Sequence, residues 1–183
     1  EEQPLEVFFA EILARIGASE KHLEGLFFPD TYLFDKRSGA LAVLKRAYGA
    51  MQAQLERTWA ERDPATPLAS PYEALILASI IEKETGRPED RGLVASVFSN
   101  RLRIGMRLQT DPSVIYGLGP DFDGRLRRSH LDTDHPWNTY TRAGLPPTPI
   151  AIPGEAALRA AVNPDKSEFL YFVARGDGSS EFS

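Results

Sequence analysis

The sequence contains no cysteine, which excludes thiol catalysis, cysteine-ligated zinc and iron–sulfur clusters. It also contains no apolar run of the roughly 18 residues needed to span a bilayer. Its 21 basic residues are outnumbered by 26 acidic ones, and the net charge of -5 argues against a nucleic-acid-binding protein. With three histidines and no G-x-S-x-G motif, a Ser-His-Asp hydrolase is poorly supported.

What the sequence does contain is typical of one globular domain over 1–183, with 42% hydrophobic residues. Apolar periodicity and Gly or Pro punctuation predict helices over 4–17, 38–61, 71–85, 88–103, 111–117 and 154–162, a buried strand over 169–174 and a returning strand at 181–182. Residues 62–70 are typical of a linker between an N-terminal helical part, 1–62, and a core, 71–183. The predicted fold class is therefore α+β, a helical core with a small antiparallel sheet.

Three helix starts carry capping signals. Ser38 is expected to cap the helix over 38–61, and Ser70 to cap the next helix, with Pro71 at its first position. Asp111 followed by Pro112 repeats this pattern, so a cap is the favoured role for Asp111.

The helix that starts at Pro71 is apolar nearly all round, which predicts a buried central helix. Its last turn carries Glu82, Lys83 and Glu84. Two residues on a helix are about 200° apart, so Glu82 and Glu84 face opposite sides. Apolar neighbours and the negative end of the helix dipole would raise the pKa of either carboxyl group, as a general acid requires. The alternative is a solvated helix end with Lys83 as dipole partner, and the pattern does not choose between the glutamates.

Several longer motifs, read in order, resemble the endolytic murein transglycosylases, the YceG-like family. They are LEGLFFPDTYLF (23–34), ASIIEKETG (78–86), VFSNRLRIGMRLQTDPSVIYGLG (97–119), NTYTRAGLPPTPIAIPG (138–154) and AAVNPDKSEFLYFVA (160–174). The resemblance covers the chain from about residue 23 to its end, and an ordered series of motifs is more specific than one short pattern.

The resemblance implies a bacterial cell-wall lyase with no cofactor. The family cleaves the β-1,4 bond between N-acetylmuramic acid and N-acetylglucosamine within a glycan strand, leaving a 1,6-anhydromuramoyl end. Its catalytic glutamate is the second of the Glu-Lys-Glu run, which is Glu84 here. The resemblance further implies an N-terminal membrane anchor and a LysM-like module, neither of which is visible in this chain. It also implies a location at the plasma membrane, with the catalytic domain facing the wall, and activity near penicillin-binding synthases.

Other residues in these motifs are candidate substrate contacts: Gln109, Asp111, Tyr116, Asn138, Tyr140, Glu24 and Asp30. Carboxylates and amides can hydrogen-bond sugar hydroxyls, and tyrosines combine a flat apolar face with a polar end. Each has a structural alternative: packed core for the tyrosines and Asn138, and bracing of a loop for Glu24 and Asp30. Asp132, Asp134 and His135 are better explained as an acidic loop than as metal ligands.

Two other functions remain open at this stage. One is a noncatalytic glycan-binding or scaffolding domain of the wall-synthesis machinery. The other is a hydrolytic muramidase, which needs a second carboxylate such as Asp111 or Asp30.

Overall fold

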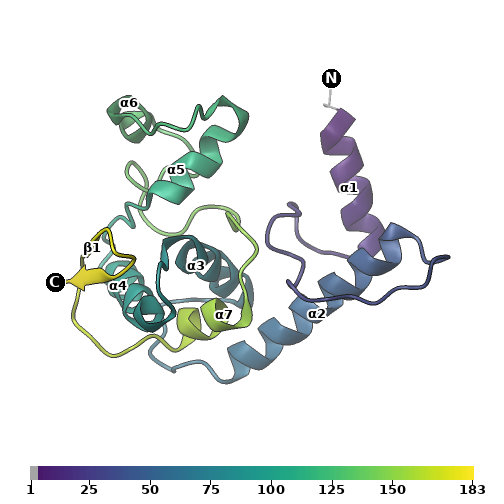
Figure 1. Cartoon of the computed structure of the whole chain (residues 1–183), viewed down its shortest axis with the longest axis horizontal. Coiled ribbons are helices and arrows are strands. Elements are labelled where there is room, and N and C mark those ends of the chain that lie inside the picture. The colour runs from purple at the N-terminus through teal and green to yellow at the C-terminus, as the bar shows by residue number, and fades with distance from the viewer. Residues whose placement is uncertain (1–3) are drawn as a thin grey trace.

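The computed structural model describes residues 4–183, and its helices surround one central helix (Figure 1). The elements in chain order are α1 (Pro4–Ile16), α2 (Ala40–Ala60), α3 (Pro71–Glu84), η1 (Pro88–Asp90), α4 (Arg91–Arg103), α5 (Asp111–Leu118), η2 (Gly119–Asp121), α6 (Arg128–Asp132), α7 (Glu155–Val162), β1 (Phe172–Ala174) and β2 (Ser180–Phe182). The α+β prediction is confirmed.

The central helix is α3, as its apolar sequence predicts. Every residue from Ala74 to Ile81 is buried, and α3 packs against α2, α4, α5 and α7. Small side chains on α7, among them Ala157 and Ala161, are fully buried and let α7 lie close to α3. The predicted cap is confirmed, since the Ser70 hydroxyl accepts a hydrogen bond from the backbone N–H of Glu73 at 3.2 Å.

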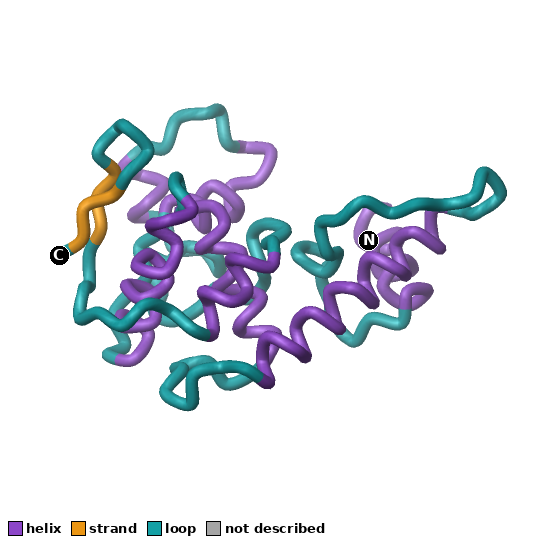
Figure 2. The backbone as a smooth tube through the Cα atoms, turned by 60° about the horizontal axis from the view of Figure 1, so that its bottom comes forward, coloured by secondary structure: helices purple, strands orange, loops and turns teal. Residues whose placement is uncertain are grey.

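The N-terminal part forms an arm beside this core. α2 runs outward from the core to α1, and the loop that leads into α2 projects at the far end (Figure 2). Residues 17–39 between the two helices form a loop, as the broken apolar pattern predicts. The segment 61–70 that joins arm and core is likewise a loop.

Three predictions about local structure were wrong. Ser38 does not occupy the cap position of α2, because the helix begins at Ala40 with Gly39 as its N-cap. Asp111 is not the cap of α5 either, because Thr110 holds that position and Asp111 is the first helical residue. The strand predicted over 169–174 is limited to β1, and Val173 is 68% exposed, because a two-stranded hairpin at the surface can bury one face only.

The hairpin still contributes to the core through that face. β1 and β2 pair antiparallel with Phe172 opposite Phe182, and the Phe172 ring meets Phe98 of α4 edge-on at 5.7 Å. Gly86, just beyond α3, lies against the hairpin turn, where an added Cβ would come 2.7 Å from the Gly178 carbonyl oxygen. The C-terminal end of α3 is thus enclosed by α4, α5 and the hairpin.

Candidate active site

A cleft of about 190 Å³ opens at the C-terminal end of α3. Its lining comes from α3, α4, α5, β1 and the loops 104–110 and 138–141, and consists of Glu84, Phe98, Arg101, Leu108, Gln109, Asp111, Tyr140 and Phe172. Four sequence-predicted site residues are therefore brought together: Glu84, Gln109, Asp111 and Tyr140. They approach from three separate chain segments around one polar opening.

Glu84 lines this cleft and is partly buried. The hydroxyl of Thr110 donates a hydrogen bond to Glu84 Oε1 at 2.5 Å. Burial raises the pKa of Glu84, the bond from Thr110 opposes that change, and the nearby Asp111 carboxylate adds to it. The net direction is upward, so the carboxyl group holds its proton to higher pH than an exposed glutamate does.

Thr110, which sequence reasoning missed, is fixed by a network of buried hydroxyl groups. It is 1% exposed, and its backbone N–H donates to Thr139 Oγ1 at 3.0 Å. Ser113 lies 2.9 Å from the same Thr139 oxygen and donates to the Thr110 carbonyl at 2.8 Å. The position of Thr110 directly before Asp111-Pro112, at a helix N-cap, was the available signal for a fixed hydroxyl.

Gln109 enters the cleft from an unusual backbone conformation. Its φ of 51° lies in the left-handed region, which costs a residue with a side chain on the order of 1 kcal/mol or more. Its N–H donates to the Thr139 carbonyl at 3.2 Å, which holds this conformation. The turn places the exposed Gln109 side chain beside the cleft, next to the buried Thr110.

Asp111 and Tyr140 form a pair at the rim. The Tyr140 hydroxyl donates to Asp111 Oδ1 at 2.5 Å. Burial and the hydrogen bond to Asp111 raise the pKa of Tyr140, and the negative charges of Asp111 and Glu84 act in the same direction. Tyr140 therefore keeps its proton and remains a donor to Asp111, an exposed residue of the cleft lining.

Glu82, the other glutamate of the run, has a different environment. Its Oε2 accepts the backbone N–H of Gly154 at 3.0 Å, and Gly154 is the N-cap of α7. A carboxylate there complements the positive end of the α7 dipole. Glu82 therefore joins two helices, whereas Glu84 faces a cleft, and this distinction was not visible in the sequence pattern.

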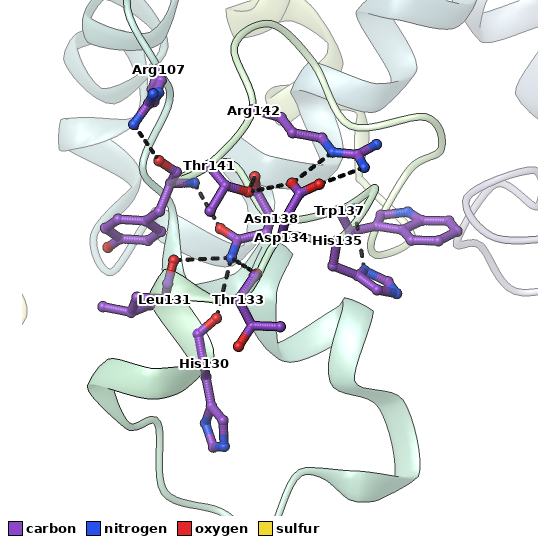
Figure 3. Close-up of polar contacts among 11 residues, drawn as sticks. Arg107, His130, Leu131, Thr133, Asp134, His135, Trp137, Asn138, Thr141 and Arg142 are labelled. Atoms are coloured by element: carbon purple, nitrogen blue, oxygen red, sulfur yellow. Dashed lines mark hydrogen bonds and ion pairs between the residues drawn. The ribbon is translucent and has the colours of Figure 1, made fainter.

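Asn138, another predicted contact, is 2% exposed and lies outside the residues that line the cleft. Its amide nitrogen donates to the carbonyls of His130, Leu131 and Thr133, at 3.2, 3.1 and 2.7 Å (Figure 3). Its amide oxygen accepts the N–H of Tyr140 at 2.9 Å. The amide is fully used in holding the loop, so Asn138 positions Tyr140.

Tyr116, Glu24 and Asp30 also lie apart from the cleft lining. The Tyr116 ring packs against Trp137 at 5.9 Å, and the charge of Glu24 together with burial raises the pKa of Tyr116. Asp30 is exposed and accepts the N–H of Thr31 at 2.7 Å, an interaction within its own loop. The structure thus places four of the predicted residues at the cleft, and the other four, Asn138, Tyr116, Glu24 and Asp30, outside its lining.

The acidic side chains of the loop 132–135 form ion pairs with arginines. Asp134 receives two 2.9 Å hydrogen bonds from Arg142 (Figure 3), which lower the pKa of Asp134 to about 2. Asp132 pairs with Arg128 at 3.1 Å. Within residues 4–183 no group of three or more histidine or acidic side chains could hold a metal ion. Over the same residues, no helix combines the length and hydropathy that a membrane crossing requires.

Arg101 is the second cleft residue that sequence reasoning missed. It is 7% exposed, its Nε donates to the Leu170 carbonyl at 2.7 Å, and its Nη1 donates to the Leu108 carbonyl at 2.6 Å. Burial lowers the pKa of Arg101, although a guanidinium remains charged at any ordinary pH. The cleft therefore combines one carboxyl group with a raised pKa, one exposed carboxylate and one buried cation.

Comparison with known proteins gives a consistent result. The model of the YceG-like family matches residues 3–183. The chain is 39% identical over 164 residues to a protein of Bacillus subtilis (strain 168) named endolytic murein transglycosylase, covering 89% of this chain and 45% of that protein. It is 33% identical to a protein of the same name from Streptococcus pneumoniae serotype 2 (strain D39), covering 83% of this chain and 28% of that one.

A solved structure is similar as well. The crystal structure of a putative YceG-like protein from Listeria monocytogenes matches with a TM-score of 0.75 and 34% sequence identity, over 99% of this chain and 61% of that one. The chain therefore spans less than half the length of the two named relatives and less than two thirds of the Listeria protein.

Proposed function

The chain belongs to the YceG-like family, and we propose that it is the catalytic part of an endolytic murein transglycosylase. Its substrate would be the glycan strand of peptidoglycan, cut at the β-1,4 bond between N-acetylmuramic acid and N-acetylglucosamine. The observation that carries the proposal is Glu84, a carboxyl group held by a buried hydroxyl at the inner side of a polar cleft, with a raised pKa.

One carboxyl group is enough for this reaction, because no water molecule takes part in it. Protonated Glu84 gives its proton to the glycosidic oxygen as the bond to C1 of the muramoyl residue breaks, and the N-acetylglucosamine end leaves with a free hydroxyl. The Glu84 carboxylate then accepts the proton of the muramoyl C6 hydroxyl, and that oxygen bonds to C1. Glu84 ends protonated again, and the product is a 1,6-anhydro ring. A raised pKa favours the first step because the acid must carry a proton at neutral pH.

Asp111 is the observation that keeps a hydrolytic muramidase as the second candidate. It is a carboxylate in the same cleft, as a hydrolase requires. In the transglycosylase proposal Asp111 has a different role, since its charge raises the pKa of Glu84 and thereby keeps the acid protonated. The two candidates differ in their products: hydrolysis leaves reducing muramoyl ends, and transglycosylation leaves anhydro ends.

The test is Glu84→Gln, measured by mass spectrometry of products from purified glycan strands. Gln keeps the shape of the side chain but carries no transferable proton, so cleavage should fall by about 10²–10⁴-fold, the range typical of general acid–base catalysis. Glycan affinity should survive. Wild-type products should end in anhydromuramic acid.

Glu82→Gln is the matched control, because it makes the same change two residues away on the same helix. It should cleave at nearly the wild-type rate. Full activity of Glu84→Gln would refute the assignment of Glu84, reducing ends would favour the muramidase, and binding without any cleavage by the wild type would favour a scaffold domain.

The cellular setting follows from the same proposal. A murein-cleaving enzyme works in the cell envelope, and we expect the full-length protein to act on nascent strands beside the penicillin-binding synthases. Attachment to the plasma membrane through a further segment of the protein belongs to this expectation as well.

A further inference from the structure

Arg101 carries a charge in the cleft that the rest of the fold does not neutralise. Within residues 4–183 its guanidinium forms no ion pair with a carboxylate. Its protein partners are the backbone carbonyls of Leu170, Leu108 and, more distantly at 3.4 Å, Arg107. Buried charges are normally paired, since removing an ion from water costs several kcal/mol.

Nη2 is the remaining nitrogen of the Arg101 guanidinium. Nε and Nη1 hold the carbonyls, whereas Nη2 has no hydrogen-bond partner among the described residues. The enclosed side-chain atoms without a partner over the same residues are Arg91 Nε and Ser99 Oγ, so Arg101 Nη2 is reached by solvent. Arg101 is one of the residues that line the cleft with Glu84, so the cleft is the route by which a ligand would approach it.

The guanidinium is also fixed in orientation. Carbonyl groups bind two of the three guanidinium nitrogens, Nε and Nη1, and the ring of Tyr171 lies 5.1 Å from the guanidinium carbon. These contacts on two nitrogens and at the Tyr171 ring fix the direction of the Nη2 donors. A charged donor with a fixed direction suits a carbonyl or carboxylate oxygen better than a sugar hydroxyl, because such oxygens accept charged hydrogen bonds most strongly.

We propose that Arg101 Nη2 binds an acyl oxygen of the muramoyl residue next to the scissile bond and so selects that residue for the cleft. This inference rests on the function proposed above. A muramoyl residue offers such an oxygen on its lactyl group at C3 and on its acetamido group at C2, whereas N-acetylglucosamine offers the second alone. The lactyl oxygen, which is anionic in peptide-free strands, pairs best with an unpaired cation.

A direct titration tests the contact without catalysis. In wild-type protein labelled with ¹⁵N-arginine, the Arg101 side-chain signal is identified by its loss in Arg101→Lys. N-acetylmuramic acid should move this signal and N-acetylglucosamine should move it much less. Equal shifts would assign the contact to the acetamido oxygen, which would overturn the selective role. No shift with either sugar at saturation would overturn the contact itself.

Steady-state kinetics provide the second test. Arg101→Lys keeps the charge but loses the Nη2 donor, so KM for peptide-free glycan should rise about tenfold, the effect of losing one charged hydrogen bond. The kcat should change far less, because this contact is made in the ground state as well as in the transition state. Peptide-bearing glycan, whose lactyl oxygen is neutral, should show a smaller rise.

Arg103→Lys is the matched control. Arg103 lies on the same helix, is exposed and donates to Ala65 and Asn100 outside the cleft, so its replacement should leave KM unchanged. An unchanged KM in folded Arg101→Lys would refute the proposal.

Should Arg101→Lys fail to fold, the wild-type titration decides, with the signal identified by its response to Tyr171→Phe. Should wild-type protein cleave no glycan, the proposed function fails, and the titration still reports on Arg101.

Discussion

A carboxyl group with a raised pKa lies near each end of α3, Glu84 on the helix itself and Glu24 on the loop between α1 and α2. At the C-terminal end, burial raises the pKa of Glu84, which is held by Thr110 beside an open cleft. Near the N-terminal end, where Tyr72 of the first turn lies beside Tyr116, burial likewise raises the pKa of Glu24. Within residues 4–183, however, no side chain forms a hydrogen bond with Glu24.

The groups around the N-terminal end join segments of the chain. Gly25 packs against Pro149, and the Trp137 indole N–H donates to Thr148 at 2.9 Å. Glu20 accepts the Tyr48 hydroxyl at 3.0 Å and so connects the loop to α2. A cavity of about 500 Å³ lies here, lined by Glu20, Tyr72 and their neighbours.

The comparison shows that a raised pKa alone does not identify a catalytic acid. Both carboxyl groups lose hydration, but Glu84 also has a fixed hydroxyl donor, a neighbouring charge and a cleft that it lines, whereas the larger cavity near Tyr72 is not lined by Glu24. The proposed chemistry therefore belongs to the C-terminal end of α3, and the groups at the N-terminal end brace the fold. Tyr72 and Glu84 lie roughly 18 Å apart along the helix, which allows each end to be tested separately.

The largest effect is expected at the bracing end, from Gly25→Ala. Its φ of +78° is strained for alanine, and the added Cβ would lie 2.6 Å from Pro149 Cβ. Strain and overpacking together should lower the free energy of unfolding by about 2–4 kcal/mol, measured by urea denaturation.

Gly17→Ala separates the two causes. Gly17 has nearly the same φ, +79°, but an added Cβ would meet no other described residue within 4 Å. This variant should lose only about 1 kcal/mol, the cost of the conformation alone. Equal losses of unfolding free energy in the two variants would show that the close contact between Gly25 and Pro149 adds nothing to the cost of the substitution.

The second prediction concerns the catalytic end, where Thr110→Val removes the hydrogen bond to Glu84. That bond lowers the pKa of Glu84, so its loss should raise the pKa further and move the alkaline limb of the kcat/KM profile to higher pH. The rate should fall about tenfold, or near 1.4 kcal/mol, because the carboxyl group is no longer oriented. Glycan cleavage measured across pH tests both effects.

Asp111→Asn should move the same limb in the opposite direction. The Asp111 charge raises the pKa of Glu84, and asparagine removes that charge while it can still accept the Tyr140 hydroxyl. Arg101 and Tyr140 also line the cleft with Glu84, and this substitution leaves both side chains in place. Shifts of the same sign in Thr110→Val and Asp111→Asn would contradict the assignment of this limb to Glu84.

Local signals in the sequence were sufficient for much of the fold. The buried helix, its Ser70 cap and the loops around it follow from nearest neighbours along the chain, and they are confirmed. Ser38 and Asp111 failed as caps because several adjacent residues can take that position, and the tertiary contacts of the first turn decide among them. The hairpin was predicted too long because its apolar residues are shared between a buried face and an exposed one.

The site was less predictable, because its contacts connect distant segments. The series of motifs placed Glu84, Gln109, Asp111 and Tyr140 among the candidates, and the structure brings these four together. A one-dimensional pattern gives no sign that Asn138 uses its whole amide on three carbonyls. It also gives no sign that Arg101, within an otherwise ordinary helix, turns its charge inward.

The smallest effect should be a gain in stability from Glu84→Gln. The pKa of Glu84 is raised in the folded state above its ordinary value of 4.5, so between these two values the folded protein binds more protons than the unfolded chain. Stability therefore falls as pH rises from 4.5 through the folded pKa, and it stays reduced above that. Gln has no charge to desolvate, so Glu84→Gln should be about 1 kcal/mol more stable than wild type at pH 7, as is common where a functional group is removed. The difference should vanish below pH 4.5, where both side chains are neutral.

Glu24→Gln should show the same pH signature without the loss of cleavage, since its pKa is raised by the same cause. A Glu84→Gln protein that is less stable than wild type at pH 7 would mean that the folded protein stabilises the carboxylate, and Glu84 could then not be the proton donor.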